Sequence, residues 1–376
     1  MRQLATVQDA VQWLRERQVQ VLSTDSRHIA AGEAFIAWPG AAVDGRAFVA
    51  QALDSGAVAA LVEQDGASAF ALDATRVASY TGLKADAGLI AAAFYGQPSA
   101  ALPVVAVTGT NGKTSTAWWL AQALSALPLA HALPCGVIGT LGVGQPPHVQ
   151  STGLTTPDPV RVQQTLRQFV DQGLRACAME ASSIGIEEHR LAGTQIRVAV
   201  FTNFTQDHLD YHGSMAAYWV SKRKLFAWPG LGHAVVNIDD AQGAVLADEL
   251  AGTLDLWTVS SQQPARLRAQ QLRHTARGMA FDVVEGDVSC TLQSQVIGNY
   301  NVSNLLGVIA AMRCLGVPLA AAVAACSTLL PVPGRMECVG GQGAPLVAID
   351  YAHTPDALAQ ALQALRPMAQ ARGGYL

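Results

Sequence analysis

The sequence has little charge and no long apolar run. Only 14% of its 376 residues are charged, 50% are hydrophobic, and the formal net charge is −4. No basic block stands out, so a nucleic-acid or anionic-membrane surface is not indicated. No run approaches the roughly 20 apolar residues of a membrane-spanning helix, and the N-terminal "MRQLATVQDAVQWLRERQ" lacks the apolar centre of a signal peptide. The composition predicts a globular protein of two or three domains with no membrane insertion.

Cysteine is also scarce. The chain has six cysteines and no CxxC pair; they are Cys135, Cys177, Cys290, Cys314, Cys326 and Cys338. Most lie in apolar stretches, which favours buried free thiols over disulfides or a metal cluster. No internal repeat or low-complexity segment is present. We therefore expect a soluble, cytoplasmic protein that acts as a monomer.

The order of apolar runs predicts an α/β fold. Residues 1–98 form a small α/β unit, with strand patterns in "VQVLSTDSRHI" and "EAFIAWPG". The segment "YGQPSAALP" predicts a linker to a central domain, residues 99–332. Strands and helices alternate in this domain, which is typical of a mainly parallel sheet with helices on both faces. Its strand candidates are "PVVAVTG", "PCGVIGT", "RACAMEA", "IRVAVFTN" and "HAVVNID".

Two further features divide the second half of the chain. The stretch "MAFDVVEGDVSCTLQ" predicts a β-hairpin within the central domain, and "LLPVPGR" predicts a boundary after it. Residues 333–376 then contain one predicted strand and one helix. A single βα unit cannot bury its own apolar face, so we expect a third domain that begins here and is not completed within this chain.

The stretch "TGTNGKTST" follows a predicted strand and precedes a predicted helix. Gly109 and Gly112 allow a sharp turn whose backbone N–H groups can point at phosphate oxygens. Lys113 adds positive charge, and Thr114 offers a hydroxyl to Mg²⁺. Val107 stands where the common GxxxxGK[ST] pattern has its first glycine. The stretch predicts nucleotide binding rather than an ordinary Gly-rich turn.

Two polar segments follow other predicted strands. "CAMEASSIGIEEHR" ends its strand at Glu180, which could either hold Mg²⁺ or cap the next helix. "TNFTQDHLDYHG" gathers Asp207, His208, Asp210 and His212. These residues suit either a metal or phosphate neighbourhood or a solvated loop, and a zinc site lacks a third soft ligand.

The remaining motifs are less specific. "GNYNVSN" places Asn301 and Asn304 on one helical face, where their amides could contact a purine or cap the helix. Lys222, taken alone, is typical of a surface lysine. "IDYAHTPDAL" sets Asp350 and His353 just past a strand.

Taken together and in order, these segments resemble the Mur ligases of peptidoglycan synthesis. Within the family they are most similar to the UDP-MurNAc-tripeptide synthetases, and meso-diaminopimelate is the favoured added amino acid. The resemblance covers almost the whole chain. It is carried by "TDSR", "WPGAAVDGRAF", "GTNGKTST", "TTPDP", "MEASSIGIEEHR", "TNFTQDHLDYHG", the Lys222 helix, "GNYNVSN", "PGRME" and "DYAHTPDAL".

The resemblance implies a fold of three parts: a UDP-substrate-binding domain, a central P-loop-type ATPase domain and the start of a Rossmann-like domain. It also implies ATP and Mg²⁺ as cofactors, small-molecule substrates, and a lysine at Lys222 that is carbamylated by CO₂. The implied catalytic residues are Lys113, Lys222 and His208. Metal binding would fall to Thr114, Glu180, His208 and Lys222.

Binding roles follow from the same resemblance. The nucleotide would contact Gly109, Thr110, Asn111, Gly112, Lys113, Thr114, Ser115, Asn301 and Arg335. The UDP-linked substrate would contact Ser26, Arg27, Thr155, Thr156, Ser182, Glu188 and Arg190. Asp350 and His353 would line the closed cleft. Some relatives carry a neutral amide where this chain has Glu188, so contact with the sugar-peptide can differ there.

Four other functions are open at this point. An L-lysine-adding ligase would share these motifs, because the residues that recognise the added amino acid lie in the third domain. A folylpolyglutamate-synthetase-like enzyme shares "GTNGKT", although the "TDSR" segment suits a UDP-linked substrate. A binding-only fragment would lack turnover. A GTPase-type switch is disfavoured because the sequence has no NKxD motif.

Overall fold

The computed structural model describes residues 1–40, 43–275, 278–340, 345–371 and 373–376. Their contacts divide the chain into two compact units. Unit 1 consists of residues 1–102, 156–172 and 184–195, and unit 2 consists of residues 103–155, 173–183 and 196–376. The α/β fold predicted from the sequence is confirmed, whereas the predicted domain boundaries stay a prediction.

Unit 1 is built on a parallel five-stranded sheet of order β1-β5-β4-β3-β2. Trp13, Leu61 and Ile90 share one of its cores with Val160 of the second stretch of the unit. Pro98 begins a short helix, so the predicted linker is partly helical. The elements of unit 1 are β1 (Arg2–Leu4), α1 (Val7–Glu16), β2 (Val21–Ser23), β3 (Glu33–Ala37), α2 (Val49–Asp54), β4 (Ala59–Glu63), β5 (Val77–Tyr80), α3 (Leu83–Phe94), α4 (Pro98–Ala101) and α6 (Pro159–Asp171). Helix α7 (Ser183–Glu187) begins at the boundary between the units.

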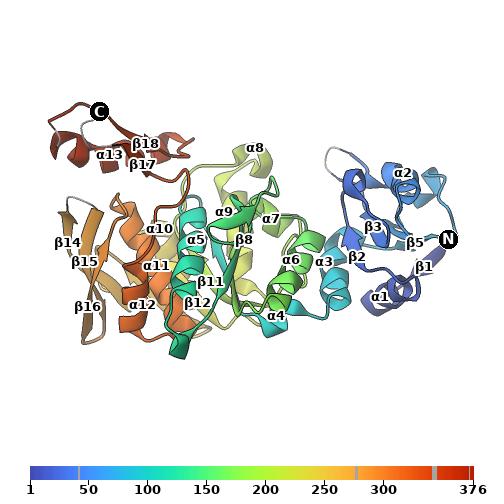
Figure 1. Cartoon of the computed structure of the whole chain (residues 1–376), viewed down its shortest axis with the longest axis horizontal. Coiled ribbons are helices and arrows are strands. Elements are labelled where there is room, and N and C mark those ends of the chain that lie inside the picture. The colour runs from blue at the N-terminus through green and yellow to red at the C-terminus, as the bar shows by residue number, and fades with distance from the viewer. Residues whose placement is uncertain (41–42, 276–277, 341–344, 372) are drawn as a thin grey trace. The chain divides into compact units, whose positions relative to one another are not determined.

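Unit 2 contains an eleven-stranded sheet of order β16-β15-β14-β13-β12-β11-β6-β10-β7-β8-β9. Its strands β14, β15 and β16 lie side by side in Figure 1. The strands from β14 to β7 in this order are parallel, and antiparallel strands extend the sheet at both ends. The five predicted central strands are all present. The strands are β6 (Val104–Thr108), β7 (Cys135–Gly139), β8 (Gly142–Gln145), β9 (His148–Gln150), β10 (Ala176–Glu180), β11 (Ile196–Phe201), β12 (His233–Asn237), β13 (Asp255–Ser260), β14 (Leu267–Thr275), β15 (Gly278–Glu285) and β16 (Val288–Ser294).

Helices cover both faces of this sheet. One face packs against three helices that contact one another: α5 (Lys113–Ser125), α11 (Tyr300–Cys314) and α12 (Leu319–Cys326). Neighbouring residues of a strand point to opposite faces, so Val200 lies in that core while Phe201 contacts Trp219 on the other side. The remaining helices are α8 (Leu209–His212), α9 (Met215–Arg223) and α10 (Ala241–Leu250).

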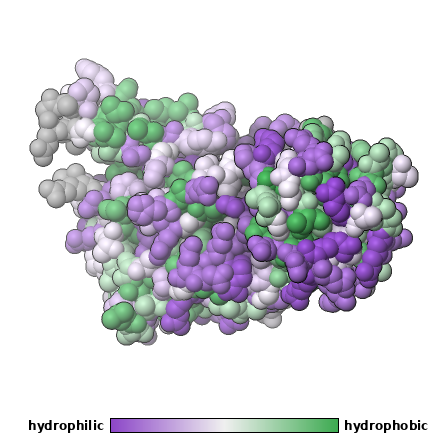
Figure 2. Space-filling model, turned by 45° about the vertical axis from the view of Figure 1, so that its right-hand side comes forward, coloured by the Kyte–Doolittle hydropathy of each residue, from purple (hydrophilic) through white to green (hydrophobic). Residues whose placement is uncertain are grey.

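The C-terminal residues of unit 2 form a small ββα segment. It consists of β17 (Glu337–Gly340), β18 (Leu346–Ile349) and α13 (Pro355–Ala371), and β17 pairs antiparallel with β18. The sequence predicted only one strand here. The segment exposes the apolar side chains of Val339, Val347, Ile349, Leu358 and Leu362, and hydrophobic groups are visible on it in Figure 2. Among the described residues, no helix has the length and apolarity needed to cross a bilayer.

Candidate active site

The sequence-predicted residues of unit 2 meet at the carboxyl ends of its parallel strands. A cavity of about 540 Å³ lies there, a volume usual for a cofactor site. Ligands of open α/β sheets bind at this edge. The lining includes Thr110, Asn111, Gly112, Lys113, Thr114, Ser115, Thr140, Thr155, Glu180, Ser182, Asn203, Asp207, His208, Asn301, Asn304, Arg335, Asp350 and His353.

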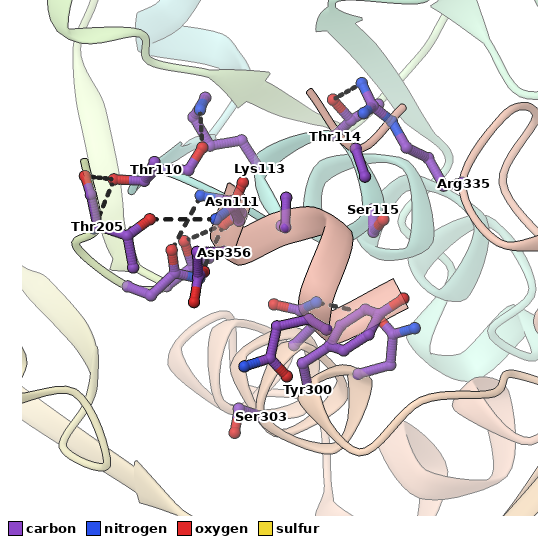
Figure 3. A pocket seen from close by; sticks show the side chains of 18 of the residues that line it. Thr110, Asn111, Lys113, Thr114, Ser115, Thr205, Tyr300, Ser303, Arg335 and Asp356 are labelled. Carbon is purple, nitrogen blue, oxygen red and sulfur yellow. Dashed lines mark hydrogen bonds between the residues drawn. The ribbon is translucent and has the colours of Figure 1, made fainter. Parts of the chain in front are cut away.

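Helix α5 directs its first turn at this cavity. Gly112 precedes the helix with a φ of +84°, a left-handed conformation that favours glycine, and no side chain caps the helix. The first N–H groups of an α-helix have no partner within the helix, and the helix dipole adds partial positive charge. This end of α5, shown in Figure 3 with Lys113, Thr114 and Ser115, therefore suits phosphate.

The preceding loop is held by the residues after β11. Thr110 N donates to Asn203 O at 2.8 Å, and Asn111 N donates to Asn203 Oδ1 at 2.9 Å. These two N–H groups are thus used within the protein, and the N–H groups at the start of α5 are the ones that face the cavity. A nucleotide phosphate would meet the start of α5 instead.

Two lysines converge on one carbonyl group. Lys113 Nζ donates to Gly109 O at 3.0 Å and to Thr110 O at 2.7 Å. Lys222 Nζ donates to Gly109 O at 2.7 Å and lies 4.2 Å from the centre of the Tyr218 ring. Lys222 is only 1% exposed, so it is not the surface lysine that its sequence context suggests. Burial lowers the pKa of both amines, and the charge of Lys113 lowers the pKa of Lys222 further.

Glu180 is a buried carboxylate at the end of β10. Its Oε1 accepts from Thr140 N at 2.7 Å, and its Oε2 accepts from the hydroxyls of Thr114 and Thr140 at 3.0 and 3.2 Å. Burial raises the pKa of Glu180, while the Thr140 N–H, the charge of Lys113 and the Thr114 hydroxyl act to lower it. The side chain is thus held inside the cavity by Thr140, directly after β7, and by Thr114 in the first turn of α5.

These oxygen donors fit Mg²⁺. Magnesium is usually held by one or two carboxylates together with substrate phosphates and waters, rather than by a full cage of protein ligands. Within the described residues no group of three or more His, Cys, Asp or Glu side chains is placed to hold a metal. Glu180 and Thr114 lie beside the proposed phosphate-binding end of α5, and they are enough for a magnesium site that is completed by phosphates and waters.

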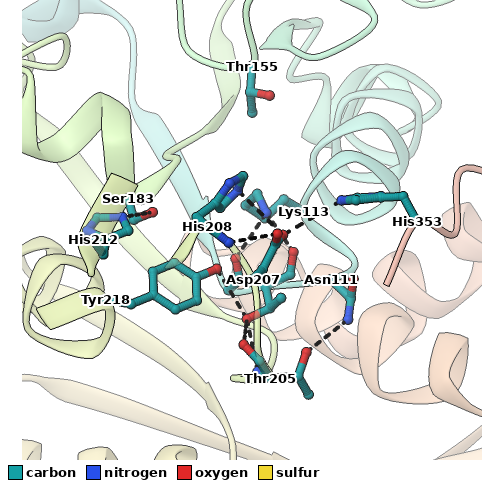
Figure 4. Close-up of polar contacts among 12 residues, drawn as sticks. Asn111, Lys113, Thr155, Ser183, Thr205, Asp207, His208, His212, Tyr218 and His353 are labelled. Carbon is teal, nitrogen blue, oxygen red and sulfur yellow. Dashed lines mark hydrogen bonds and ion pairs between the residues drawn. The ribbon is translucent and has the colours of Figure 1, made fainter. Parts of the chain in front are cut away.

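A second polar group surrounds Asp207 (Figure 4). Asp207 Oδ2 lies 3.5 Å from His208 Nε2 and 3.8 Å from His353 Nε2. Burial lowers the pKa of His208, while the charge of Asp207 acts to raise it, and the lowered pKa favours the neutral imidazole that can act as a ligand. The residues after β11 and the residues after β18 therefore meet at Asp207, as lining of one cavity. His212 lies elsewhere, with its Nε2 2.9 Å from Ser183 Oγ.

Arg335 reaches from the predicted boundary into the site. Its Nη2 donates to Thr114 Oγ1 at 3.2 Å, and its guanidinium lies 4.4 Å from the centre of the Tyr351 ring. Burial lowers the pKa of Arg335, while the charge of Glu180 acts to raise it. A cation therefore stands beside the Thr114–Glu180 pair.

The two asparagines of α11 are bonded to each other. Asn304 Nδ2 donates to Asn301 Oδ1 at 2.9 Å, and Asn301 Nδ2 donates to Ile297 O at 2.7 Å. Helix α11 begins after Asn299, whose side chain makes no capping bond. Both asparagines line the cavity. Neither caps the helix, contrary to the alternative interpretation of this motif; their amides are held by each other and by Ile297 O.

The predicted contacts to the UDP-linked substrate are divided between the units. Thr155 and Ser182 line the cavity of unit 2, where the hydroxyl oxygens of Thr155 and Thr140 are 3.1 Å apart. In unit 1, Arg190 Nη1 donates to Thr156 O at 3.0 Å. The structure thus brings together Arg190 and Thr156.

The other predicted substrate residues of unit 1 have partners of their own. Ser26 begins a turn in which the Arg27 guanidinium pairs with Asp25 at 2.8 Å. Glu188 Oε2 lies 2.7 Å from Lys84 Nζ. This ion pair gives the acidic residue at position 188 a structural role within unit 1.

Sequence reasoning overlooked Thr140, Asn203 and Tyr218. Thr140 and Asn203 are the last residues of the predicted strand stretches "PCGVIGT" and "IRVAVFTN", at the same carboxyl-end position as Glu180, and this position was the signal that could have found them. Tyr218 lies one helical turn before Lys222, and its hydroxyl donates to Thr110 Oγ1 at 3.3 Å. Helical spacing could have grouped it with Lys222.

Three family models match this chain. They are the Mur ligase family catalytic domain over residues 18–87, the Mur ligase middle domain over residues 107–312, and the Mur ligase glutamate ligase domain over residues 334–374. The middle-domain match contains the phosphate loop, Glu180 and Lys222. The site is thus that of a nucleotide-dependent ligase fold, and the chain belongs to the Mur ligase family.

Individual relatives narrow the similarity further. The chain is 61% identical over 377 residues to the UDP-N-acetylmuramoyl-L-alanyl-D-glutamate–2,6-diaminopimelate ligase of Acidovorax sp., a match that covers 99% of this chain and 75% of the relative. A ligase of the same name from Janthinobacterium sp. is 45% identical over 94% of this chain and 72% of its own length. A solved structure of a ligase with this name superposes with a TM-score of 0.76 at 32% identity, covering 92% of this chain and 70% of the other.

Proposed function

We propose that this chain carries out the ATP-dependent joining of meso-diaminopimelate to UDP-MurNAc-L-Ala-D-Glu through an acyl phosphate. The relatives named above support the substrates. The observation that carries the chemistry is that the N-terminus of α5, Glu180 and Thr155 line one cavity. A carboxylate is a poor acylating agent, whereas an acyl phosphate reacts readily with an amine, and this is why the reaction needs ATP.

The chain's own residues would act on the phosphates in three ways. The first turn of α5 would hold phosphate oxygens, and Lys113 would place its charge against the phosphoryl group in transfer. Thr114 and Glu180 would hold Mg²⁺, which supplies charge neutralisation when bound. The remaining nucleotide contacts would come from Gly109, Thr110, Asn111, Gly112, Ser115, Asn301 and Arg335.

Lys222 is proposed to be carbamylated. An amine must be neutral to react with CO₂, and the lowered pKa of Lys222 favours that form. The carbamate would replace a second positive charge beside Lys113 by a negative one. With His208, it would support a metal ion next to the phosphates.

The UDP-linked substrate is proposed to contact Thr155, Thr156, Ser182 and Arg190, with Ser26 and Arg27 at its uridine diphosphate end. Glu188, whose carboxylate pairs with Lys84, completes the proposed set. We also propose a cytoplasmic location, which agrees with the free state of all six cysteines.

The function is tested by ADP release in the presence of UDP-MurNAc-L-Ala-D-Glu, with and without meso-diaminopimelate or L-lysine. We expect release that requires the UDP-substrate and rises with meso-diaminopimelate. A rise with L-lysine alone would change the assigned amino acid. Tight ATP and UDP-substrate binding without turnover would identify a binding-only chain, and failure to bind either would refute the proposal.

Two variants test whether ADP release depends on Lys113. Lys113→Met should abolish ADP release because it removes the cation nearest the phosphates. Arg223→Ala removes an exposed cation that pairs with Glu249 at 2.8 Å, and it should leave the release unchanged. Equal activity of both variants would contradict the role of Lys113.

A further inference from the structure

The residues that follow β11 form a strap across the phosphate loop. The strap consists of residues 202–205, and the phosphate loop consists of residues 109–112. Thr202 Oγ1 donates to Asn111 O at 2.6 Å, and Thr110 Oγ1 donates to Thr205 O at 3.0 Å. Thr205 N donates back to Thr110 Oγ1 at 3.0 Å. The two segments are more than ninety residues apart in sequence, so the sheet is what brings them together.

Asn203 is the centre of the strap. Its Oδ1 accepts from Asn111 N at 2.9 Å, and its Nδ2 donates to Asn111 O at 3.0 Å. Its own carbonyl accepts from Thr110 N at 2.8 Å. One side chain thus satisfies both backbone groups of Asn111, the residue directly before Gly112, and so fixes the direction in which the chain enters α5.

The strap is itself anchored on its far side. Asn237 Nδ2, at the end of β12, donates to Thr202 O at 2.8 Å, and Phe204 N donates to Asp240 Oδ2 at 2.8 Å. The strap then leads directly into Asp207 and His208. The phosphate loop and the turn that carries Asp207 and His208 are therefore both held by the segment that follows β11.

We propose that Asn203 is a positioning residue for the nucleotide phosphates: its amide holds the backbone of Asn111 so that the first turn of α5 faces the β- and γ-phosphates. It acts through the loop rather than on the reacting atoms. Because the amide uses both of its functional groups on Asn111, a residue with only one suitable group cannot replace it. The inference rests on the proposed nucleotide-binding function.

The test compares ATP and AMP binding by isothermal titration calorimetry in Mg²⁺ buffer. Asn203→Ala removes both amide contacts. Asn203→Asp keeps the volume but sets a carboxylate oxygen against the Asn111 carbonyl. We expect each variant to raise the dissociation constant of ATP about tenfold or more, since contacts worth about one hydrogen bond each are lost. The dissociation constant of AMP, which lacks the β- and γ-phosphates, should change less than about twofold. If Asn203→Ala does not fold, the dissociation constants measured for Asn203→Asp test the proposal.

The matched control is Gln163→Ala in unit 1. Gln163 is also a buried amide, and its Nε2 donates to Ala192 O and Thr194 Oγ1 at 3.2 and 2.9 Å. The Gln163→Ala variant should have a lower melting temperature, and the ratio of its dissociation constants for ATP and AMP should stay unchanged. Asn203 variants that bind ATP as the wild type does, or that lose ATP and AMP equally, would overturn the inference alone. A wild-type chain that does not bind ATP would overturn the proposed function and this inference with it.

Discussion

Gly139 controls the position of the proposed metal-binding carboxylate, and a single methyl group should disturb it. Gly139 ends β7, the strand next to β10. A Cβ at this position would overlap Glu180 Oε1 and lie 3.0 Å from both Glu180 Cδ and Cγ. The backbone of Gly139 is outside the left-handed region. The cost of the Gly139→Ala substitution therefore comes from the collision with Glu180 and not from backbone strain.

The size of the effect follows from how firmly Glu180 is held. Its carboxylate is buried and would have to break the 2.7 Å bond from Thr140 N in order to move. Leaving that buried N–H without a partner costs about 1–3 kcal/mol, and forcing an extra methyl into a packed site costs about 1–3 kcal/mol. We expect the free energy of unfolding to fall by about 2–6 kcal/mol. The Mg²⁺-dependent affinity for ATP should fall at least about tenfold, which corresponds to about 1.4 kcal/mol.

The assay combines thermal unfolding with ATP titration in Mg²⁺ and in EDTA, below the melting temperature of the variant. Gly307→Ala is the control, because its Cβ would meet only Val200 Cγ1, at 3.7 Å. That variant adds a methyl group within a helix and should be neutral or slightly stabilising. If Gly139→Ala matched Gly307→Ala in both stability and Mg²⁺-dependent ATP affinity, the reasoning about Glu180 would be refuted.

Three other predictions concern single residues. Glu180→Ala should weaken Mg²⁺-dependent turnover by about a hundredfold or more while leaving UDP-substrate binding nearly unchanged; equal losses in steady-state kinetics and substrate titration would make the residue structural. Lys222→Ala should be almost inactive and partly restored by a small carboxylic acid that replaces the carbamate, and full activity without any acid would remove Lys222 from the mechanism. Burial raises the pKa of Tyr80 and of Tyr95 to about 12, so the stability that these phenols contribute is complete below their usual pKa of 10 and is lost as the pH rises through 12. The part of the 295 nm absorbance titration that is lost in a Tyr80→Phe, Tyr95→Phe variant reports these two phenols, and we expect it to appear near pH 12 rather than near pH 10 while circular dichroism shows a folded chain; a lost part centred near pH 10 would contradict this.

The sequence predicted the sheet and the phosphate loop well because both depend on local pattern. The central strands are short apolar runs, and the turn into α5 is specified by its own glycines. The sequence did not predict the antiparallel strands β8 and β9, the parallel strand β13, helix α12, strand β17 or the helical part of the predicted linker.

Contacts between distant segments could not be predicted in this way. Asn111 and Asn203 are 92 residues apart, and Glu180 and Thr140 are 40 apart. Their pairing depends on strand order, which no local pattern encodes. Lys222 shows the same limit: its burial arises from the packing of α9 near the end of β6, whereas a lysine in the last turn of a helix is typical of an exposed residue in the sequence alone. For such residues the family resemblance supplied the role, and the structure supplied the neighbours.

The three-part composition of unit 1 restricts the order in which the chain can fold during synthesis. Residues 1–102 emerge from the ribosome first, yet the unit also includes residues 156–172 and 184–195. Val160 belongs to the core that contains Ile90, and Gly88 of α3 packs so closely on Ala192 that no side chain would fit between them. The N-terminal unit therefore cannot complete its core until residue 195 has been made. By then β6, α5, β7 and β10, which belong to the other unit, have already been translated, so the two units must fold as overlapping rather than successive events.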